Sequence, residues 1–194
     1  NENRGLVESM HLGLSKCKGE YVAFLESDDY WEENYLEVKA DYIRKNEDVS
    51  ILCNKIKTIG SPIRDKAVER YHSVFSKETD KNLFGYFSLE NILPTFSAVM
   101  IKKSIFESLN FDTPIKPWLD FWLWRQFAFH YNFSYTDETT TYWRIHEQSY
   151  IKRTKYGLEH RDILVSASNK LLMKDNLFLF LYLDRYNLVK WIFS

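Results

Sequence analysis

The sequence lacks any large excess of charge, because 26 Lys and Arg residues oppose 27 Asp and Glu residues and leave a net charge of −1. A nearly neutral chain offers no electrostatic basis for binding nucleic acid, so we expect no nucleic-acid partner. The chain has only two cysteines, Cys17 and Cys53, and their spacing matches no cysteine-based metal site, so we expect both to be reduced. No internal repeat is detectable, and the apolar run 177–183 is followed by Asp184 and Arg185, unlike an ordinary membrane-spanning segment.

Hydrophobic residues make up 45% of the 194 residues, which is enough for the core of one domain with an appendage. Apolar spacing in the first part of the chain predicts helix, strand, helix and strand in turn, at 5–17, 21–25, 32–45 and 49–53. This alternation indicates an α/β fold built on a mainly parallel sheet. Further strands are expected at 97–101 and 133–145, and further helices at 102–109, after Pro117, at 157–173 and at 176–193. Residues 58–81 have few periodic apolar positions, so we expect a long surface loop there.

Three carboxylates within four residues follow the apolar run Tyr21–Leu25, which reads as a strand buried on both faces. These are Glu26, Asp28 and Asp29. Clustered negative charge at the end of a buried strand suggests a divalent cation such as Mg²⁺ or Mn²⁺, shared with a substrate phosphate. The alternative is that the same acids cap the helix that follows. The acids alone favour neither interpretation.

Two further residues carry potential chemistry. Asp120 lies in the first turn of the helix that begins after Pro117, and it is surrounded by tryptophans in the sequence. A carboxylate there either caps the helix or is a partly desolvated base with a raised pKa. His146 follows the predicted strand at 133–145, where an isolated histidine is more often structural than functional.

Taken together, these segments resemble the family 2 glycosyltransferases, the inverting group with the GT-A fold. The resemblance rests on four landmarks in order: Gly19-Glu20-Tyr21-Val22 with Glu26-Ser27-Asp28-Asp29, then Ser97-Ala98-Val99-Met100, then Leu119-Asp120 with Arg125, then Trp143-Arg144-Ile145-His146-Glu147-Gln148-Ser149. It covers roughly residues 3–149. The resemblance implies a GT-A-like sheet flanked by helices and a nucleotide-diphosphate sugar as donor.

The resemblance also implies a role for each matched position. Asp120 corresponds to the general base that takes a proton from the acceptor hydroxyl. Asp28 and His146 correspond to contacts of Mn²⁺ or Mg²⁺ and the diphosphate. Glu26 would approach the ribose of a nucleotide sugar, for which UDP is favoured, and Asp29 would support Asp28 at the metal. Arg144 is expected at the same nucleotide-sugar site.

Several positions depart from the family pattern. Glu26 stands where the family usually has Asp, Met10-His11 replaces an Arg-Asn pair, and Leu119 replaces the acid before Asp120. Family members also begin with two strands and an Asp-containing loop that hold the base and ribose, and nothing before Asn1 supplies them. We therefore expect a domain incomplete at its N-terminus. The alternative is a catalytically impaired or truncated GT-A-like module with a binding or structural role only.

The expected organisation is a partial GT-A domain at 1–150 and a helical extension at 151–194. The implied substrates are a nucleotide sugar and a saccharide acceptor, used in surface polysaccharide synthesis. Residues 58–81 and the neighbourhood of 94–97 are expected to shape the acceptor site. The C-terminal helix is expected to pack on the domain, with a homodimer or peripheral membrane contact as alternatives, and the expected location is cytoplasmic or at the inner face of the membrane.

Overall fold

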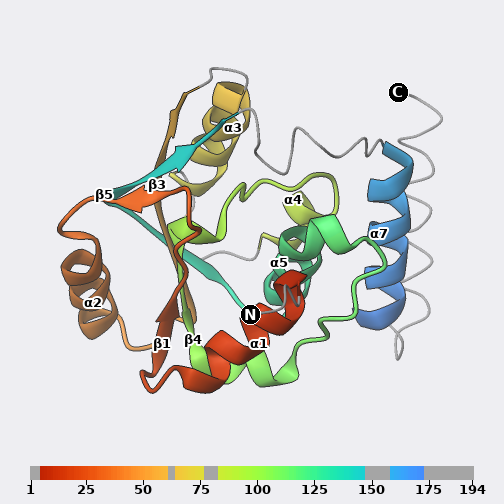
Figure 1. Ribbon diagram of the computed structural model, residues 1–194, viewed down its shortest axis with the longest axis horizontal. Helices are drawn as coiled ribbons and strands as arrows, with labels where there is room; N and C mark the ends of the chain where they lie inside the picture. The colour runs from red at the N-terminus through yellow and green to blue at the C-terminus, as the bar shows by residue number, and fades with distance from the viewer. Residues whose placement is uncertain (1–4, 61–63, 77–82, 147–157, 173–194) are drawn as a thin grey trace.

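The computed structural model describes residues 5–60, 64–76, 83–146 and 158–172. Its centre is one five-stranded mixed sheet, in the order β1-β4-β3-β5-β2 (Figure 1). The strands are β1 (Tyr21–Ala23), β2 (Tyr30–Trp31), β3 (Ile51–Ile59), β4 (Val99–Lys102) and β5 (Phe133–Arg144). The expected α/β class with a mixed sheet is therefore confirmed.

The direction of strand pairing differs in part from the prediction. Only β3 and β5 pair in parallel, over the longest register of the sheet, from Ile51↔Phe133 to Ile59↔Arg144. The other three pairings of the described strands are antiparallel. The expectation of a mainly parallel sheet is therefore wrong for these pairings, because β4 runs against both of its neighbours.

The acid-tipped strand is shorter and less buried than the sequence predicts. β1 ends at Ala23, pairs with β4 alone and forms an edge of the described sheet. Phe24 is half-buried and Leu25 is 51% exposed. An unbroken apolar run thus indicated a strand buried on both faces, whereas the chain leaves the sheet halfway along it.

Helices cover both sides of the sheet. In Figure 1, α2 lies on one side of it, α1, α4 and α5 lie on the other, and α7 packs outside α5. The described α-helices are α1 (Gly5–Lys16), α2 (Tyr35–Lys45), α3 (Asp65–Phe75), α4 (Phe84–Phe87), α5 (Leu119–His130) and α7 (Leu158–Leu172). Short 3₁₀ segments occur at η2 (Phe96–Ala98), η3 (Lys103–Ser108) and η4 (Lys116–Trp118). None of the helices in the described part is both long and apolar enough to cross a membrane.

Helix α3 overturns the expectation of one long loop at 58–81. Val68, Tyr71, Val74 and Phe75 share one buried face at helical spacing. The Tyr71 hydroxyl donates a hydrogen bond of 2.6 Å to the carbonyl of Asn54 and so ties α3 to β3. The charged residues that fill the outer face of α3 obscured this pattern in the sequence.

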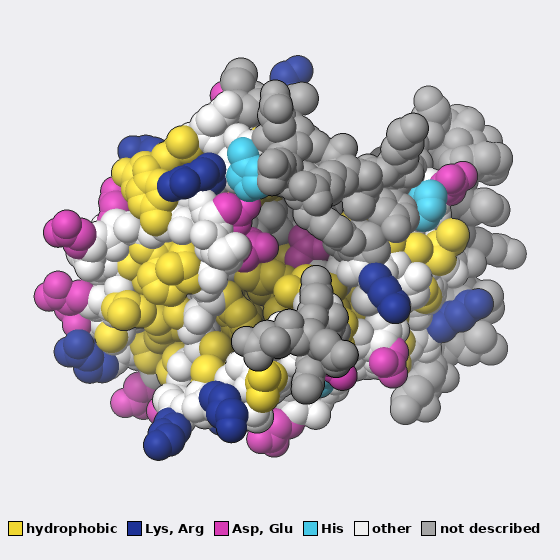
Figure 2. Space-filling model, in the orientation of Figure 1, with side chains coloured by type: hydrophobic (Ala, Val, Ile, Leu, Met, Phe, Trp, Pro, Cys, Tyr) yellow, Lys and Arg dark blue, Asp and Glu magenta, His cyan; other side chains and the backbone are white. Residues whose placement is uncertain are grey.

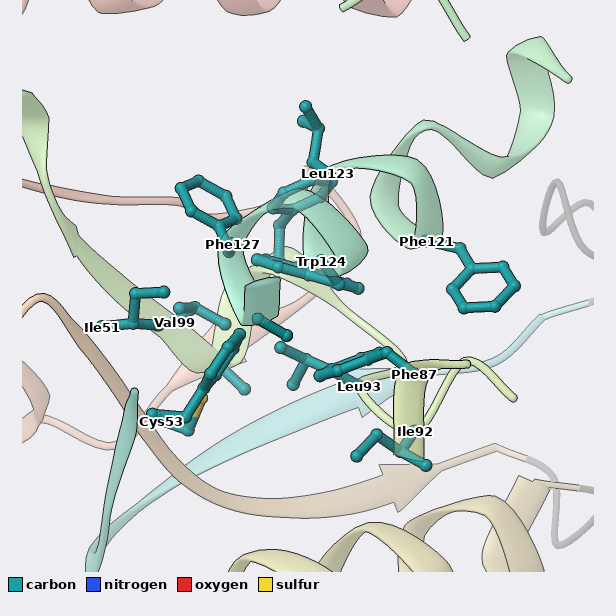
Figure 3. Packing of buried hydrophobic residues seen from close by; sticks show 14 of the residues in the cluster. Ile51, Cys53, Phe87, Ile92, Leu93, Val99, Phe121, Leu123, Trp124 and Phe127 are labelled. Carbon is teal, nitrogen blue, oxygen red and sulfur yellow. The ribbon is translucent and has the colours of Figure 1, made fainter. Parts of the chain in front are cut away.

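The core lies between the sheet and α5. Figure 3 shows Trp124 and Phe127 of α5 above Cys53 and Val99 of the sheet, with Leu93 beside them. Trp124 and Phe127 are completely buried. Cys17 and Cys53 are both free thiols, as expected. The expected helix at 176–193 and residues 147–149 of the last landmark lie outside the described residues.

Candidate active site

The acidic turn after β1 is held by the backbone. The Asp29 amide donates to the Glu26 carbonyl at 3.0 Å, which closes the turn. The Glu26 amide donates to the Ser97 hydroxyl at 3.0 Å and fixes the turn against η2, just before β4. Two distant landmarks, the acids and the Ser97 segment, therefore meet at the same end of the sheet.

The η2 segment is itself firmly anchored. The Ser97 carbonyl accepts hydrogen bonds from Trp31 Nε1 at 2.7 Å, Tyr35 Oη at 3.3 Å and Thr141 Oγ1 at 3.1 Å. Lys39, which is completely buried, donates to the carbonyls of Leu52 at 2.6 Å and Ala98 at 3.2 Å. These contacts come from β2, α2 and β5, so three elements fix the position of the support beneath the acids.

A single hydroxyl lies between two of the carboxylates. Thr95 Oγ1 is 2.5 Å from Glu26 Oε2 and 2.9 Å from Asp29 Oδ2, while it accepts a hydrogen bond from the Ser97 amide at 3.0 Å. Loss of solvation raises the pKa of Glu26 to about 7 against the hydrogen bond from Thr95, and the charges of Asp29, Asp120 and Asp28 act in the same upward direction. One hydroxyl proton cannot be donated fully to both acids, so this cluster favours a bound proton or cation.

Asp29 faces inward rather than toward solvent. Its side chain is buried, and its Oδ1 accepts a hydrogen bond of 2.9 Å from the Arg144 backbone amide. Burial raises its pKa, and hydrogen bonds from Ser97, Arg144 and Thr95 oppose that shift. Asp29 therefore links the acidic turn to the end of β5, and both of its carboxylate oxygens already have hydrogen-bond partners.

Asp28 and His146 meet at the surface. Asp28 Oδ2 lies 3.1 Å from His146 Nε2, although the two residues are 118 positions apart. Their side chains remain 39% and 42% exposed. The Ile145 amide donates to the Ile59 carbonyl at 2.8 Å and so fixes the backbone just before the histidine.

One carboxylate and one imidazole suit a divalent ion that takes its other ligands from phosphate and water. The described residues contain no group of three or more His, Cys, Asp or Glu side chains placed to hold a metal by themselves. The donor set at Asp28 and His146 therefore fits an ion shared with a substrate better than a metal held by protein ligands alone.

Arg144 extends the site along the surface. Its guanidinium lies 5.7 Å from the centre of the Tyr30 ring, and that ring stacks on Tyr142 at 4.7 Å. The Lys57 ammonium lies 5.8 Å from the centre of the Tyr142 ring on β5. The guanidinium is thus positioned through a cation–π contact, beside the segment that carries His146.

Asp120 lies at the N-terminus of α5. Its Oδ2 accepts a hydrogen bond of 2.8 Å from the Asn91 side-chain amide, and the backbone amides of Asp120 and Phe121 also stabilise the carboxylate. Burial nevertheless raises its pKa to about 6, against these hydrogen bonds. The charge of Asp120 contributes to the raised pKa of Glu26, so the two carboxylates lie within electrostatic range. Figure 2 shows a hollow on this face with acidic side chains beside a histidine and hydrophobic side chains around them.

The tryptophans near Asp120 contribute less to the surface than the sequence suggests. Trp122 and Trp124 are 3% and 0% exposed, and the Trp122 indole donates to the Asn110 carbonyl at 2.7 Å. Both therefore belong to the core and are not available to contact an acceptor. Trp118, which is half-buried, is the ring of this group with accessible surface.

Sequence reasoning missed Thr95 and Asn91. The structure brings together Glu26, Asp28, Asp29, Arg144 and His146, and it places Asp120 in electrostatic range of Glu26. Thr95 contacts Glu26 and Asp29, and Asn91 donates to Asp120, through hydrogen bonds between distant segments that no local pattern reveals. The neighbourhood of 94–97 was singled out, but as a determinant of acceptor binding rather than as the support of the acids.

Comparisons with known proteins show the family and the fold of the chain. The model of Glycosyl transferase family 2 matches residues 1–109, more than half of the chain, and the chain belongs to that family. It is 23% identical to EpsH of Bacillus subtilis (strain 168), assigned as a glycosyltransferase, over 90% of this chain and 52% of that protein. It is 28% identical to the uncharacterized glycosyltransferase MJ1057 of Methanocaldococcus jannaschii, over 79% of this chain and 52% of that protein.

Among solved structures, the crystal structure of S. aureus TarS 1-349 is similar with a TM-score of 0.53 and 17% identity. The similarity covers 92% of this chain and 55% of that one, and it supports the GT-A-like fold. The chain thus spans about half the length of the curated relatives it matches. The family match ends before Asp120, Arg144 and His146, so it does not cover these positions.

Proposed function

We propose that this chain carries the acceptor and diphosphate side of an inverting, metal-dependent glycosyltransferase. The donor is a nucleotide-diphosphate sugar, with a UDP-sugar favoured, and the acceptor is a saccharide hydroxyl in surface polysaccharide synthesis. The observation that carries the proposal is the contact of His146 with Asp28 at the acidic turn, together with the electrostatic effect of the Asp120 charge on Glu26. Family membership supports the transferase class.

In this proposal Asp120 is the general base. Its carboxylate takes the proton of the acceptor hydroxyl as that oxygen bonds to the anomeric carbon. The bond from the anomeric carbon to the diphosphate oxygen breaks on the opposite face, so the configuration inverts. A pKa of about 6 leaves the carboxylate mainly ionised at neutral pH and makes it more basic than a fully solvated aspartate.

The diphosphate end of the donor would lie at Asp28, His146 and Arg144. Asp28 and His146 would hold Mn²⁺ or Mg²⁺, which offsets the negative charge that develops on the leaving diphosphate. Arg144, exposed and oriented by Tyr30, supplies a second positive charge on the same side. Glu26 would face the ribose, and Asp29 would hold the turn and the end of β5 together.

A second function is supported by a specific observation. Glu26 stands where the family usually has Asp, and Leu119 stands where it usually has an acid. These two departures favour a module that keeps the GT-A-like fold but only binds ligands or partners. Within either proposal, 1–150 is the glycosyltransferase unit and 151–194 a helical extension, of which α7 packs on α5.

The location and partners of the chain are also proposed. We place it in the cytoplasm or at the inner face of the membrane, where nucleotide sugars would be supplied. Residues 151–194 would mediate any dimer or peripheral membrane contact. Flotation with anionic liposomes, with and without residues 176–194, tests the membrane contact, and equal flotation of both forms would contradict it.

The deciding experiment replaces the base. The chain and its Asp120→Asn variant are incubated with Mn²⁺, a panel of UDP-sugars and a saccharide mixture, and UDP release is measured. We expect transfer to fall about 10²- to 10⁴-fold, because the amide cannot accept the proton. Asp112→Asn, an exposed aspartate before the same helix, is the matched control. Undiminished transfer by Asp120→Asn would remove the proposed base, and no transfer by any form would favour the binding module.

A further inference from the structure

Three arginines from three helices converge on residues 84–91, which comprise α4 and the turn after it. Arg70 of α3, Arg125 of α5 and Arg161 of α7 each contact this 84–91 segment. Backbone hydrogen bonds within the segment also stabilise the turn, since the Leu89 and Glu90 amides both donate to the Tyr86 carbonyl, at 2.9 and 3.1 Å. A short surface turn is therefore fixed from several directions.

Each arginine uses a different part of the segment. Arg70 Nε lies 2.7 Å from Glu90 Oε1, and its guanidinium lies 5.5 Å from the centre of the Tyr86 ring. Arg161 donates to the Leu89 carbonyl at 3.4 Å. These two contacts hold the outer part of the turn to α3 and α7.

Arg125 makes the buried contact. Its side chain is completely buried, donates to the Phe87 carbonyl at 2.6 Å and lies 5.1 Å from the centre of the Phe84 ring. On the other side, it donates to Asn169 Oδ1 at 2.5 Å and to the Ser168 hydroxyl, both on α7. Burial lowers the pKa of Arg125 to about 9, which still leaves it charged at neutral pH. One guanidinium thus joins α5, α7 and the 84–91 segment.

The segment ends at Asn91, whose side-chain amide donates to Asp120 Oδ2 at 2.8 Å. Asn91 is exposed and outside any helix, so its own amide could be solvated by water without this bond. The bond instead stabilises the desolvated carboxylate of Asp120, beside the backbone amides of Asp120 and Phe121. Glu26 is the titratable group that faces Asp120 from the acidic turn.

We propose that Asn91 is a positioning residue for Asp120. In this proposal Arg125, which binds both α7 and the 84–91 segment, holds that segment and therefore Asn91 in place. The inference rests on the proposed function, in which Asp120 is the base. It assigns a role in the active site to α7, which lies beyond the residues matched by the family model. The alternative is that the 84–91 segment is tightly packed for stability alone and that its bond to Asp120 is incidental.

The test measures the ionisation of Asp120 directly. The carboxyl carbons of the full chain are labelled with ¹³C at aspartate, and the Asp120 resonance is assigned by its loss in Asp120→Asn and titrated with pH. Asn91→Leu removes the donor at an exposed position, so we expect the midpoint for Asp120 to rise by about 0.5 pH unit or more. Asn91→Gln keeps a side-chain amide donor, so the midpoint for Asp120 should lie close to that of the parent protein. Asn132→Leu, an exposed asparagine beyond the other end of α5, should leave the midpoint unchanged.

A second variant tests the connection to α7. Asn169→Ala removes one acceptor of Arg125, and we expect the Asp120 midpoint to move in the same direction as in Asn91→Leu. Combining the two changes should give less than the sum of their shifts, because both act through one contact. Unchanged midpoints in Asn91→Leu would overturn the proposal, and additive shifts would overturn the role of Arg125. These readings need no substrate, so they are independent of whether Asp120→Asn abolishes transfer.

Discussion

The acids of the site differ in ionisation because their neighbours differ. Asp120 is desolvated at a helix N-terminus, where one side-chain amide and two backbone amides stabilise it, and its pKa is raised to about 6. Desolvation also raises the pKa of Glu26, and the charges of Asp29, Asp120 and Asp28 add to it, so that it reaches about 7. The sequence predicted which residues matter here, since each lies in a landmark. It could not predict their ionisation, which depends on Thr95 and Asn91 from other segments.

The first prediction at this scale concerns the pH dependence of transfer. Asp120 must be ionised to accept a proton, so activity should be low below pH 6 and rise through about pH 6 as the carboxyl group loses its proton. The measurement is kcat/KM for UDP release between pH 5 and 8 under saturating Mn²⁺. A rise of kcat/KM centred near pH 4 instead would contradict the desolvation of Asp120.

The second prediction concerns the buried Lys39, which donates to Leu52 and Ala98 below the acids. Burial lowers its pKa from 10.5 to about 7. Between these values the unfolded chain binds a proton that the folded chain does not, so this group makes stability rise with pH from about 7 upward.

Lys39→Met should therefore flatten the rise in the free energy of unfolding between about pH 7 and 9. Urea denaturation of both proteins at pH 7, 8 and 9 measures it. Lys45→Met, an exposed lysine at the end of the same helix, is the control and should follow the parent protein. Parallel curves for Lys39→Met and the parent would show that Lys39 keeps its proton in the folded chain.

At the scale of elements, periodicity succeeded where a helix or strand has one clear apolar face. The helices α1, α2 and α5 and the strand β5 lie close to their predicted ranges. It failed at α3, whose buried residues are diluted by charge, and at β1, where Phe24 and Leu25 continue an apolar run beyond the sheet. In both cases tertiary contacts decide the boundary: Tyr71 binds Asn54, and the acidic turn binds Ser97.

The third prediction concerns the end of β3. Gly60 has φ +93°, and a Cβ at this position would lie 2.5 Å from the Ile145 carbonyl oxygen. Gly60→Ala should destabilise the fold by about 1–3 kcal/mol and displace the segment that carries His146. Urea denaturation measures the first effect, and Mn²⁺ affinity measures the second.

The matched control is Gly13→Ala. This glycine lies inside α1, and an added Cβ would meet nothing within 4 Å. It should raise stability by about 0.5–1 kcal/mol, because alanine favours a helix over glycine. Equal effects of the two substitutions would show that the contact with Ile145 relaxes without cost.

At the scale of the whole molecule, one sheet end gathers groups from the entire described chain. The acidic turn follows β1, Thr95 and Ser97 precede β4, Asp120 opens α5, and His146 follows β5. The order of landmarks in the sequence predicted this convergence through the family resemblance. The composition alone predicted only the core of one domain with an appendage and no nucleic-acid partner.

The fourth prediction concerns ligand binding by the chain as a whole. UDP with Mn²⁺ should quench tryptophan fluorescence, and chelation of the metal should abolish the change. His146→Ala should weaken the Mn²⁺-dependent binding by roughly 10-fold or more, as is typical when a group of a metal site is removed. His130→Ala, an exposed histidine at the end of α5, is the control. Identical UDP binding with and without metal would contradict the proposed diphosphate site.

The parallel pairing of β3 and β5 has a consequence for how the protein is made. β3 leaves the ribosome more than seventy residues before its partner β5 is complete, since their registered residues run from Ile51↔Phe133 to Ile59↔Arg144. During translation the apolar residues of β3 therefore stay unpaired until β5 is synthesised, and contacts between residues so far apart in the sequence form slowly. A lower growth temperature should therefore raise the yield of native protein, because aggregation competes during that interval and the hydrophobic association that drives it weakens on cooling.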